Sequence, residues 1–240
     1  MTPPRHNLTR PLTPLLGRER ELAAVLDRID GGARLVTLTG SAGFGKTRLA
    51  TACALELAGS EAAFPGGVWF VDLSAAGSAA EICAAVARAL DLALTATSEA
   101  DAGRALIGSH LCGSDRTLLV LDNLDDIVAI AAELVSTWLL AAPDLVVLTT
   151  SRERLGVVPE RCEPIGALGL PESGADPGQA AAVRLFIARA TAVYPSLPVT
   201  GDAMTAIAAL VDALDGNPLA IELAAARAAP VARGALLAAP

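Results

Sequence analysis

The sequence predicts an α/β protein in which a parallel five-stranded sheet is followed by a small helical domain. Apolar, β-rich runs alternate with helical patterns over the first 168 residues, and parallel neighbours need helical crossovers of this kind. A glycine-rich loop joins the first expected strand to the helix after it, and past residue 172 only helical patterns remain. A chain of 240 residues is long enough for a domain of this size and a smaller satellite.

The individual elements follow from the spacing of the apolar residues. Strands are expected at residues 34–39, 66–74, 116–123, 144–152 and 161–168. The near-continuous apolar run Leu118–Leu121 is typical of a strand that is buried on both faces. Residues 15–29 are expected to form a turn at Gly17 and then an amphipathic helix. Further helices are expected from 46 to a stop at Gly59, at 78–92 behind a Ser78/Glu81 capping box, and at 127–141.

Composition divides the chain into three parts. Residues 1–14 are rich in Pro and Thr and are expected to form an extended lead-in. Residues 15–171 are predicted to form the α/β domain, which ends at the Pro-, Gly- and acid-rich stretch LPESGADPGQ. Residues 172–240 are predicted to be a helical lid, with helical patterns at 180–193, 202–214 and 218–229.

Charge and composition narrow the classes of partner. The net charge is −8 and no basic stripe is visible, so direct contact with nucleic acid is not expected from this segment. The four cysteines contain no CxxC pair, which favours a reducing, cytoplasmic location over a metal cluster. The N-terminus lacks an apolar signal-peptide core, and the apolar stretch 127–142 is interrupted by Glu133 and short for a membrane span.

The clearest motif is GSAGFGKT, residues 40–47, which fits GxxxxGK[ST] between an expected strand and an expected helix. Backbone N–H groups in such a loop converge on phosphate oxygens, and the helix N-terminus adds its positive end. Lys46, the only lysine in the chain, would lie between the β- and γ-phosphates, and Thr47 would bind Mg²⁺. The residues expected to contact a nucleotide here are Gly40, Ser41, Ala42, Gly43, Phe44, Gly45, Lys46, Thr47 and Arg48.

An acid at the end of the third strand is the expected partner of this loop. Asp122 ends an apolar strand and would hold Mg²⁺ together with Thr47, although DNLDD is also simply a turn-forming sequence. Asn123 stands where many ATPases have a glutamate, and an amide can orient water but cannot take its proton. Asp125 or Asp126 could substitute, unless they are only acids at a helix N-terminus. Slow hydrolysis is the resulting hypothesis.

Arg152 is the candidate that would distinguish ATP from ADP. It follows the fourth strand at its carboxyl end, where ligands bind in open α/β sheets. A guanidinium makes paired hydrogen bonds to phosphate oxygens, which suits contact with a γ-phosphate. Arg154 is a rival for this role, and an ordinary surface arginine is the alternative.

Taken together, these motifs resemble the signal-transduction ATPases with numerous domains (STAND), which include the NB-ARC domains. The likeness is strongest to the ATPase modules of large actinobacterial transcriptional regulators of the LuxR-like and SARP-like kinds. It runs from about residue 15 to residue 227 and includes six motifs in order: LLGRERELAAVL, GSAGFGKTRLA, GGVWFVDLS, LLVLDNLDDI, LTTSRERLGV and LDGNPLAIELAAAR.

The resemblance implies an AAA+-like core, in which the sensor strand lies between the P-loop strand and the Walker B strand, followed by a helical lid. It implies that Leu16, Gly17 and Arg18 border the adenine and ribose, and that Pro218 packs over the nucleotide. Asn217–Pro218 is in any case a good helix start. The family usually continues into a winged helix and effector or DNA-binding domains, which are therefore expected outside this chain.

The function that the resemblance implies is an ATP/ADP switch with slow Mg²⁺-dependent hydrolysis. ADP would hold core and lid closed, and exchange for ATP would open them and favour self-association. A small-molecule kinase is the alternative enzyme, although the segment after residue 175 is poor in the arginines that a kinase lid needs. A GTPase would need a second lysine in NKxD, and a nucleotide-binding scaffold without turnover would share every site.

Overall fold

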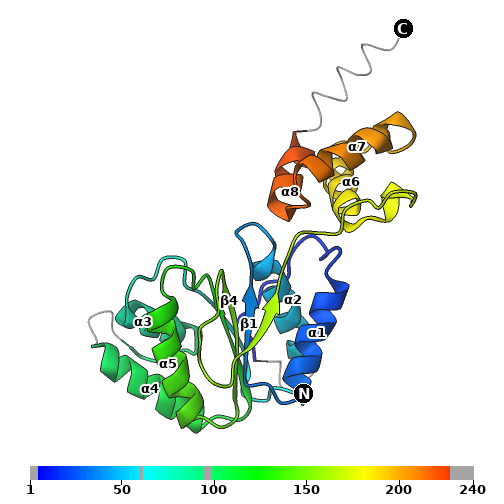
Figure 1. The fold of residues 1–240 in the computed structure, drawn as a ribbon. Coiled ribbons are helices and arrows are strands. Elements are labelled where there is room, and N and C mark those ends of the chain that lie inside the picture. Colours follow the sequence, from blue (N-terminus) through cyan, green and yellow to red (C-terminus); the bar gives the residue numbers. More distant parts are fainter. Residues whose placement is uncertain (1–4, 60–61, 95–98, 228–240) are drawn as a thin grey trace. The chain divides into compact units, whose positions relative to one another are not determined.

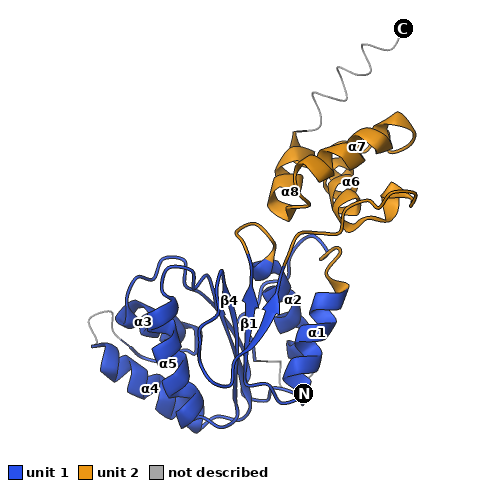
Figure 2. Ribbon diagram, in the orientation of Figure 1, with its two compact units in different colours: residues 1–14, 20–40, 46–165 blue, residues 15–19, 41–45, 166–240 orange. Residues whose placement is uncertain are grey.

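The computed structural model describes residues 5–59, 62–94 and 99–227, and the chain divides into two compact units (Figures 1 and 2). The first, which we call the sheet unit, comprises residues 1–14, 20–40 and 46–165. The second, the lid unit, comprises residues 15–19, 41–45 and 166–240. Two short segments from the N-terminal part of the chain are therefore grouped with the C-terminal helices.

The sheet unit contains a five-stranded parallel sheet with the order β2-β3-β4-β1-β5. Its strands are β1 (Leu35–Thr39), β2 (Gly67–Asp72), β3 (Thr117–Asp122), β4 (Leu145–Ser151) and β5 (Arg161–Pro164). Strands β3 and β4 are buried along their whole length, as their apolar sequences predict. Because β4 lies between β1 and β3, the predicted fold class and strand order are confirmed.

Helices cover both faces of this sheet. Figure 1 shows α3, α4 and α5 on one side and α1 and α2 on the other. Their bounds are α1 (Glu19–Asp30), α2 (Lys46–Ala58), α3 (Ala79–Ala89), α4 (Ala100–Cys112) and α5 (Val128–Ala141). On the first side Ile82, Ile107 and Trp138 are fully buried in one apolar cluster with the strands. This double covering keeps the centre of the sheet away from water and leaves the strand ends for function.

The helix α4 was not predicted, and its glycines explain why. Gly103 and Gly108 both lie inside it, and glycine weakens a helix by about 1 kcal/mol relative to alanine. A Cβ at Gly103 would lie 2.8 Å from the Cβ of Cys83 in α3. The glycine therefore permits a close approach of two helices, which is a tertiary requirement that local propensity does not reveal.

The N-terminal lead-in runs beside the edge strand β2. Arg5 accepts a hydrogen bond through its carbonyl from the N–H of Val68 (2.9 Å). The side chain of Asn7 accepts from the N–H of Phe70 (2.7 Å) and donates to its carbonyl (2.8 Å). These contacts occupy part of an otherwise open sheet edge.

Up to residue 227, the lid unit contains three α-helices, α6 (Ala181–Val193), α7 (Asp202–Ala213) and α8 (Pro218–Ala226), after a 3₁₀ turn at Pro177–Gln179. Their apolar cluster is centred on Phe186, Val211 and Ile221. Asn217 caps α8, because its side-chain oxygen accepts from the N–H groups of Leu219 (3.0 Å) and Ala220 (3.2 Å), which confirms the predicted helix start. The predicted continuation to residue 229 lies partly outside the described residues.

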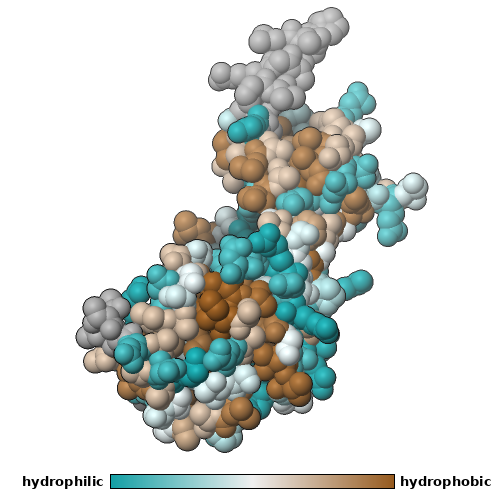
Figure 3. Space-filling model, turned by 60° about the vertical axis from the view of Figure 1, so that its left-hand side comes forward, coloured by the Kyte–Doolittle hydropathy of each residue, from teal (hydrophilic) through white to brown (hydrophobic). Residues whose placement is uncertain are grey.

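On the face shown in Figure 3, hydrophobic side chains gather in a patch on the sheet unit, and polar side chains lie around it. Among the described residues, the large hydrophobic side chains that are most exposed are Leu12, Leu140 and Val158. Isolated residues of this kind are ordinary on protein surfaces. Across the part of the chain that the structure describes, no helix combines the length and the apolar character needed to cross a bilayer.

Candidate functional site

The predicted site residues of the sheet unit lie at the carboxyl ends of three adjacent strands. Gly40 follows β1, Asp122 ends β3, and Arg152 follows β4. Because the strands are parallel and adjacent, these ends meet at one edge of the sheet, which is where open α/β sheets bind ligands. The topology thus brings together residues that are more than 100 positions apart in sequence.

The glycines of the loop after β1 have backbone conformations that other residues rarely adopt. Gly43 and Gly45 have φ of 81° and 88°, in the left-handed region. Gly40 has φ of 152°, and a Cβ there would lie 2.2 Å from the carbonyl oxygen of Ile165. The path of the loop therefore depends on both backbone freedom and the lack of a side chain.

Lys46 and Thr47 are the first two residues of α2, and the side chain of each contacts the end of a strand or the residue after it. The Lys46 ammonium donates to the carbonyl of Gly40 at 2.7 Å, across the base of the loop. The Thr47 hydroxyl lies 2.9 and 3.0 Å from the two carboxylate oxygens of Asp122. The structure thus places these three predicted residues together. A hydroxyl beside a carboxylate is a pair of hard oxygen ligands, which fits Mg²⁺.

Asp122 is a buried carboxylate that is held by hydroxyl donors. Its exposed fraction is 1%, and burial is the largest cause that raises its pKa above the usual value. Hydrogen bonds from Thr150 (2.6 Å) and Thr47 oppose that rise, as does the charge of Lys46, whereas the charge of Asp72 adds to it. A bound cation would favour the ionised form of Asp122 in the same way.

Asn123 is held by both its backbone and its side chain. Its φ of 66° lies in the left-handed region, which asparagine tolerates better than most residues. Its N–H donates to the Thr150 hydroxyl at 3.0 Å. Its side-chain Nδ2 donates to Asp122 Oδ2 (3.0 Å) and to Asp72 Oδ1 (3.1 Å). Asn123, which stands where many ATPases have a glutamate, is therefore held in place by these hydrogen bonds.

Asp72 is a site residue that the sequence analysis missed. It ends β2 and is the register partner of Asp122, so two acids stand side by side on adjacent strands. Its pKa is lowered, chiefly by the hydrogen bond from the N–H of Ser74. The pattern that could have revealed it is the similarity of VWFVD to LLVLD, two apolar strands that each end in an aspartate.

Arg152 is paired with the two acids that were candidates for a catalytic base. Its Nε lies 3.1 Å from Asp125 Oδ2 and its Nη2 lies 3.3 Å from Asp126 Oδ1. Its N–H donates to Asp125 Oδ1 at 2.6 Å. The structure therefore joins the predicted sensor arginine to Asp125 and Asp126, a pairing that the sequence did not indicate.

In the lid unit, the N-terminal segment and the tip of the loop are held by Arg18. Its exposed fraction is only 4%, and its guanidinium donates to the carbonyls of Phe44 (3.1 Å) and Gly166 (2.5 Å). At Gly17 a Cβ would lie 2.4 Å from the Cβ of Ala181, and Leu16 packs against the lid core. These residues have structural roles alongside the nucleoside contacts predicted for them.

The tip of the loop and the start of α8 both belong to the lid unit (Figure 2), and a main-chain hydrogen bond joins them. The N–H of Leu219 donates to the carbonyl of Gly43 at 3.2 Å. A Cβ at Gly43 would lie 2.9 Å from Asn217 Oδ1 and 3.1 Å from the Cβ of Leu219. Pro218, the predicted lid proline, lies between Asn217 and Leu219 in the sequence. It therefore directly precedes the residue whose N–H contacts the loop.

Arg48, the last of the residues predicted to contact a nucleotide, holds the lead-in in the sheet unit. Its Nη2 donates to the carbonyl of Thr13 (3.0 Å), to the Thr13 hydroxyl (2.9 Å) and to the carbonyl of Pro14 (3.1 Å). Ser41, Ala42 and Thr47, in contrast, are exposed. The accessible part of the motif is therefore the loop and the first turn of α2.

A family model described as an AAA domain matches residues 29–158, more than half of the chain. The chain belongs to this AAA domain family. The match includes the loop, Asp122 and Arg152, and the predicted recognition as a P-loop ATPase domain is confirmed.

Two relatives of this AAA domain come from Mycobacterium tuberculosis. An uncharacterised protein is 33% identical over 223 residues, which are 93% of this chain and 53% of that protein. A candidate HTH-type transcriptional regulator is 36% identical over 195 residues, which are 81% of this chain and 20% of that protein. The chain thus spans about half the length of the first relative and a fifth of the second.

Among solved structures, the AAA domain is similar in fold to a Walker-type ATPase of Pyrococcus abyssi. The TM-score is 0.59 at 15% identity, and the match covers 92% of this chain and 71% of that one. At this identity the likeness concerns the fold alone.

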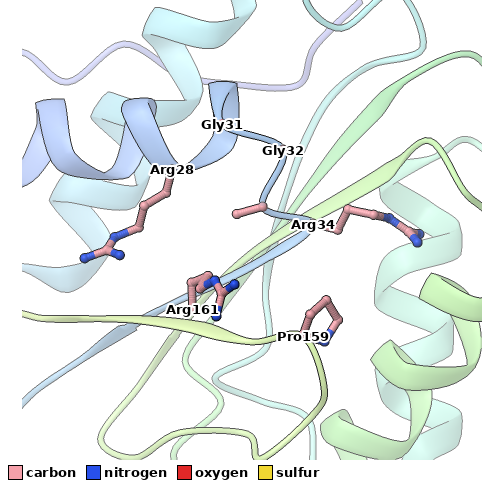
Figure 4. Close-up of a pocket in the computed structure, with 7 residues that line it drawn as sticks. Arg28, Gly31, Gly32, Arg34, Pro159 and Arg161 are labelled. Carbon is pink, nitrogen blue, oxygen red and sulfur yellow. The ribbon is translucent and has the colours of Figure 1, made fainter.

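A cavity of about 280 Å³ lies at the amino ends of β1 and β5, away from the carboxyl ends that carry the predicted site (Figure 4). Arg28, Arg34 and Arg161 line it with Gly31, Gly32, Ala33 and Pro159. Arg28 is paired with Glu163, and the guanidinium of Arg34 donates to the carbonyls of Leu139, Ala142 and Leu145. Two of the three arginines are thus engaged in structural bonds, and no predicted site residue lines the cavity.

Proposed function

We propose that this AAA domain is a nucleotide-dependent switch that binds ATP or ADP with Mg²⁺ and hydrolyses ATP slowly. It would control the self-association or the output of a transcriptional regulator in the cytoplasm, where ATP and Mg²⁺ are supplied. The observation that carries the proposal is a contrast within one site. Lys46, Thr47 and Asp122 lie together and are groups of the kind that bind a metal-bound phosphate, whereas the residue directly after Asp122 is Asn123 and not a carboxylate that could activate water.

Binding would use the loop and the first turn of α2. The N–H groups of residues 41–45 and the Lys46 ammonium would bind phosphate oxygens, and Thr47 and Asp122 would hold Mg²⁺. Bound Mg²⁺ neutralises phosphate charge and orients the phosphate oxygens. Leu16, Gly17 and Arg18 would border the nucleoside, and Pro218 would contact the nucleotide from the lid. In this proposal, residues 15–171 are the nucleotide-binding domain and residues 172–240 are the lid.

Slow hydrolysis follows from the groups near Asp122. Asn123 can orient a water molecule but cannot accept its proton. Asp125, the alternative base, accepts a hydrogen bond from the N–H of Arg152 and is paired with its guanidinium, so its carboxylate is already occupied by that arginine. A low rate suits a switch, because the bound state then persists long enough to be read by other parts of the protein.

Arg152 is the group that would report the γ-phosphate. Its side chain is 56% exposed, and exposed ion pairs are worth about 1 kcal/mol or less. A guanidinium can therefore leave Asp125 and Asp126 at little cost and make stronger paired bonds to phosphate. ADP would leave Arg152 with the two acids, and ATP would recruit it.

The regulatory context is supported by the relative that is named as a candidate HTH-type transcriptional regulator. That relative is about five times as long as the aligned part of this chain, and its DNA-binding element would belong to the rest of the protein. In the same way, effector and DNA-binding parts would lie outside the residues of this chain and would be the partners of the switch.

The test is to purify the protein without added nucleotide, denature it and identify what is released by ion-exchange chromatography. Stoichiometric ADP is the expected result, together with Mg²⁺-dependent release of phosphate from added ATP. An empty site that transfers phosphate to a small acceptor would instead indicate a kinase. Tight nucleotide binding with no phosphate release over hours would indicate a scaffold without turnover.

A further inference from the structure

We propose that Asp72 is a positioning residue for ATP hydrolysis. Together with Asp122 it holds the side-chain amide of Asn123, so that the amide oxygen Oδ1 is aimed at the attacking water. This inference rests on the proposed function, because it assigns a partner to the water that attacks ATP. It also makes a structural claim that is testable without hydrolysis.

Two carboxylates on adjacent strands flank the amide. Asp72 ends β2 and Asp122 ends β3, and the two are register partners. The Nδ2 of Asn123 lies 3.1 Å from Asp72 Oδ1 and 3.0 Å from Asp122 Oδ2. Each hydrogen of the NH₂ group therefore has its own carboxylate acceptor, and the amide is held at two points rather than one.

The identity of these acceptors fixes which end of the amide faces them. An ionised carboxylate only accepts hydrogen bonds, so an amide oxygen turned toward Asp72 and Asp122 would meet lone pairs on both sides. Asp122 already accepts the hydroxyls of Thr47 and Thr150, and Asp72 accepts the N–H of Ser74 at 2.9 Å. The NH₂ group must face the acids, and Oδ1 must face away.

The backbone removes the remaining freedom. The left-handed φ of Asn123 and the bond from its N–H to the Thr150 hydroxyl fix its Cα, which leaves only the side-chain torsions. Asp72 and Asp122 fix those torsions. Among the described residues no donor bonds Oδ1, so this oxygen can accept a hydrogen from a water molecule. A water that donates one hydrogen in a fixed direction has its lone pairs aimed as well.

Loss of the Asp72 carboxylate should therefore lower turnover rather than nucleotide affinity. In Asp72→Ala we expect the single-turnover rate of ATP hydrolysis to fall about tenfold, as for one orienting hydrogen bond. The dissociation constants of ATP and ADP should change by less than about threefold. Asp72→Asn keeps an acceptor oxygen and should retain most of the rate. Asp144→Ala, which removes an exposed carboxylate before β4 at the other edge, is the matched control.

A readout without catalysis separates this inference from the proposed function. In ¹⁵N NMR spectra both side-chain NH₂ protons of Asn123 should be protected from solvent exchange in the wild type. In Asp72→Ala one of them should exchange at least about tenfold faster. A wild type that never hydrolyses ATP would contradict the proposed function and leave this measurement valid. Unchanged exchange in Asp72→Ala would overturn the positioning role itself.

A reversed pair gives a second structural test. N123D removes both donated hydrogens and adds a third carboxylate, while aspartate tolerates the same left-handed backbone. D72N combined with N123D restores an amide-to-carboxylate bond in the opposite direction. We expect N123D to lower the melting temperature of the nucleotide-free protein, and the double variant to recover most of the loss. Simple additivity of the two single effects would contradict a direct bond.

Discussion

The two ends of β1 both carry charged residues, but the partners of those residues differ. At the carboxyl end, Thr47 and Asp122 bind each other and Arg152 binds the half-buried Asp125 and the exposed Asp126, all of which a ligand can replace. At the amino end, Arg34 binds three main-chain carbonyls and Arg28 binds Glu163. A side chain that a ligand can separate from its present partner is available for function, whereas Arg34, with three main-chain acceptors, mainly holds the fold.

The largest effect is expected at the carboxyl end, for Lys46→Ala. One charge pair at about 4 Å and an effective dielectric near 20 is worth about 4 kcal/mol before desolvation. ATP affinity measured by isothermal titration calorimetry should therefore fall by at least about a hundredfold. Arg161→Ala, at the amino end, is the control and should leave ATP affinity unchanged. Equal ATP affinity in Lys46→Ala and wild type would sink the assignment of the loop.

The second effect belongs to the amino end and should appear in stability only. Arg34→Ala removes charge-assisted hydrogen bonds to the carbonyls of Leu139 in α5, of its C-cap Ala142, and of Leu145 at the start of β4. The free energy of unfolding in urea should fall by about 2 kcal/mol. ADP affinity, measured well below the unfolding transition, should stay within about twofold of wild type. A loss of ADP affinity without a loss of stability would contradict the assignment of a purely structural role to the amino ends of the strands.

The third effect is a pH dependence of nucleotide binding through Asp122. Its pKa is raised mainly by burial, and the ionised form is the one that a cation favours. Mg²⁺–ADP affinity should therefore fall as pH drops through that raised pKa, by about tenfold per pH unit for one proton. The same linkage applies to stability, because the folded state binds this proton more tightly than the unfolded state does. The free energy of unfolding of the nucleotide-free protein should therefore rise as pH falls from the folded pKa of Asp122 toward 3.8, the ordinary value.

Titration of the Asp122 carboxyl by ¹³C NMR checks this prediction. The midpoint should lie above 3.8 without nucleotide and move down when Mg²⁺–ADP binds. A midpoint that does not respond to Mg²⁺–ADP would mean that Asp122 takes no part in metal binding.

The smallest effect is expected for Arg152→Ala, because the exposed pair that it breaks is worth about 1 kcal/mol or less. The free energy of unfolding and the affinity for ADP should barely change. ATP affinity should fall more than ADP affinity, since only ATP has a γ-phosphate for the guanidinium. Arg154→Ala is the matched control on the neighbouring turn, and equal losses for ATP and ADP would contradict a sensing role.

Sequence reasoning succeeded where the requirement is local. The loop needs glycine at positions 43 and 45 because of the backbone conformation there. The alternation of strands and helices follows from the spacing of apolar residues along the chain. It failed where the requirement comes from another part of the chain. Gly103 is in α4 because Cys83 lies against it, and Asp72 matters because β2 is aligned with β3.

Arginine roles show the same limit. Arg18 contacts the carbonyl of Gly166, 148 residues away, and Arg152 contacts Asp125, 27 residues before it. The sequence shows that these side chains can donate several hydrogen bonds, but the acceptors depend on which segments the fold brings near. These two arginines could therefore be predicted as site residues from the sequence, but the groups that accept their hydrogen bonds could not.

The bond between the N–H of Leu219 and the carbonyl of Gly43 has a practical consequence for mutagenesis. It joins the first turn of α8 to the loop through main-chain atoms, so replacing the Leu219 side chain with alanine leaves both atoms in place. An alanine scan of α8 would pass over this contact entirely. Only a change in the backbone, such as Leu219→Pro, would remove the donor, and relatives could differ freely in side chain here while keeping the same link.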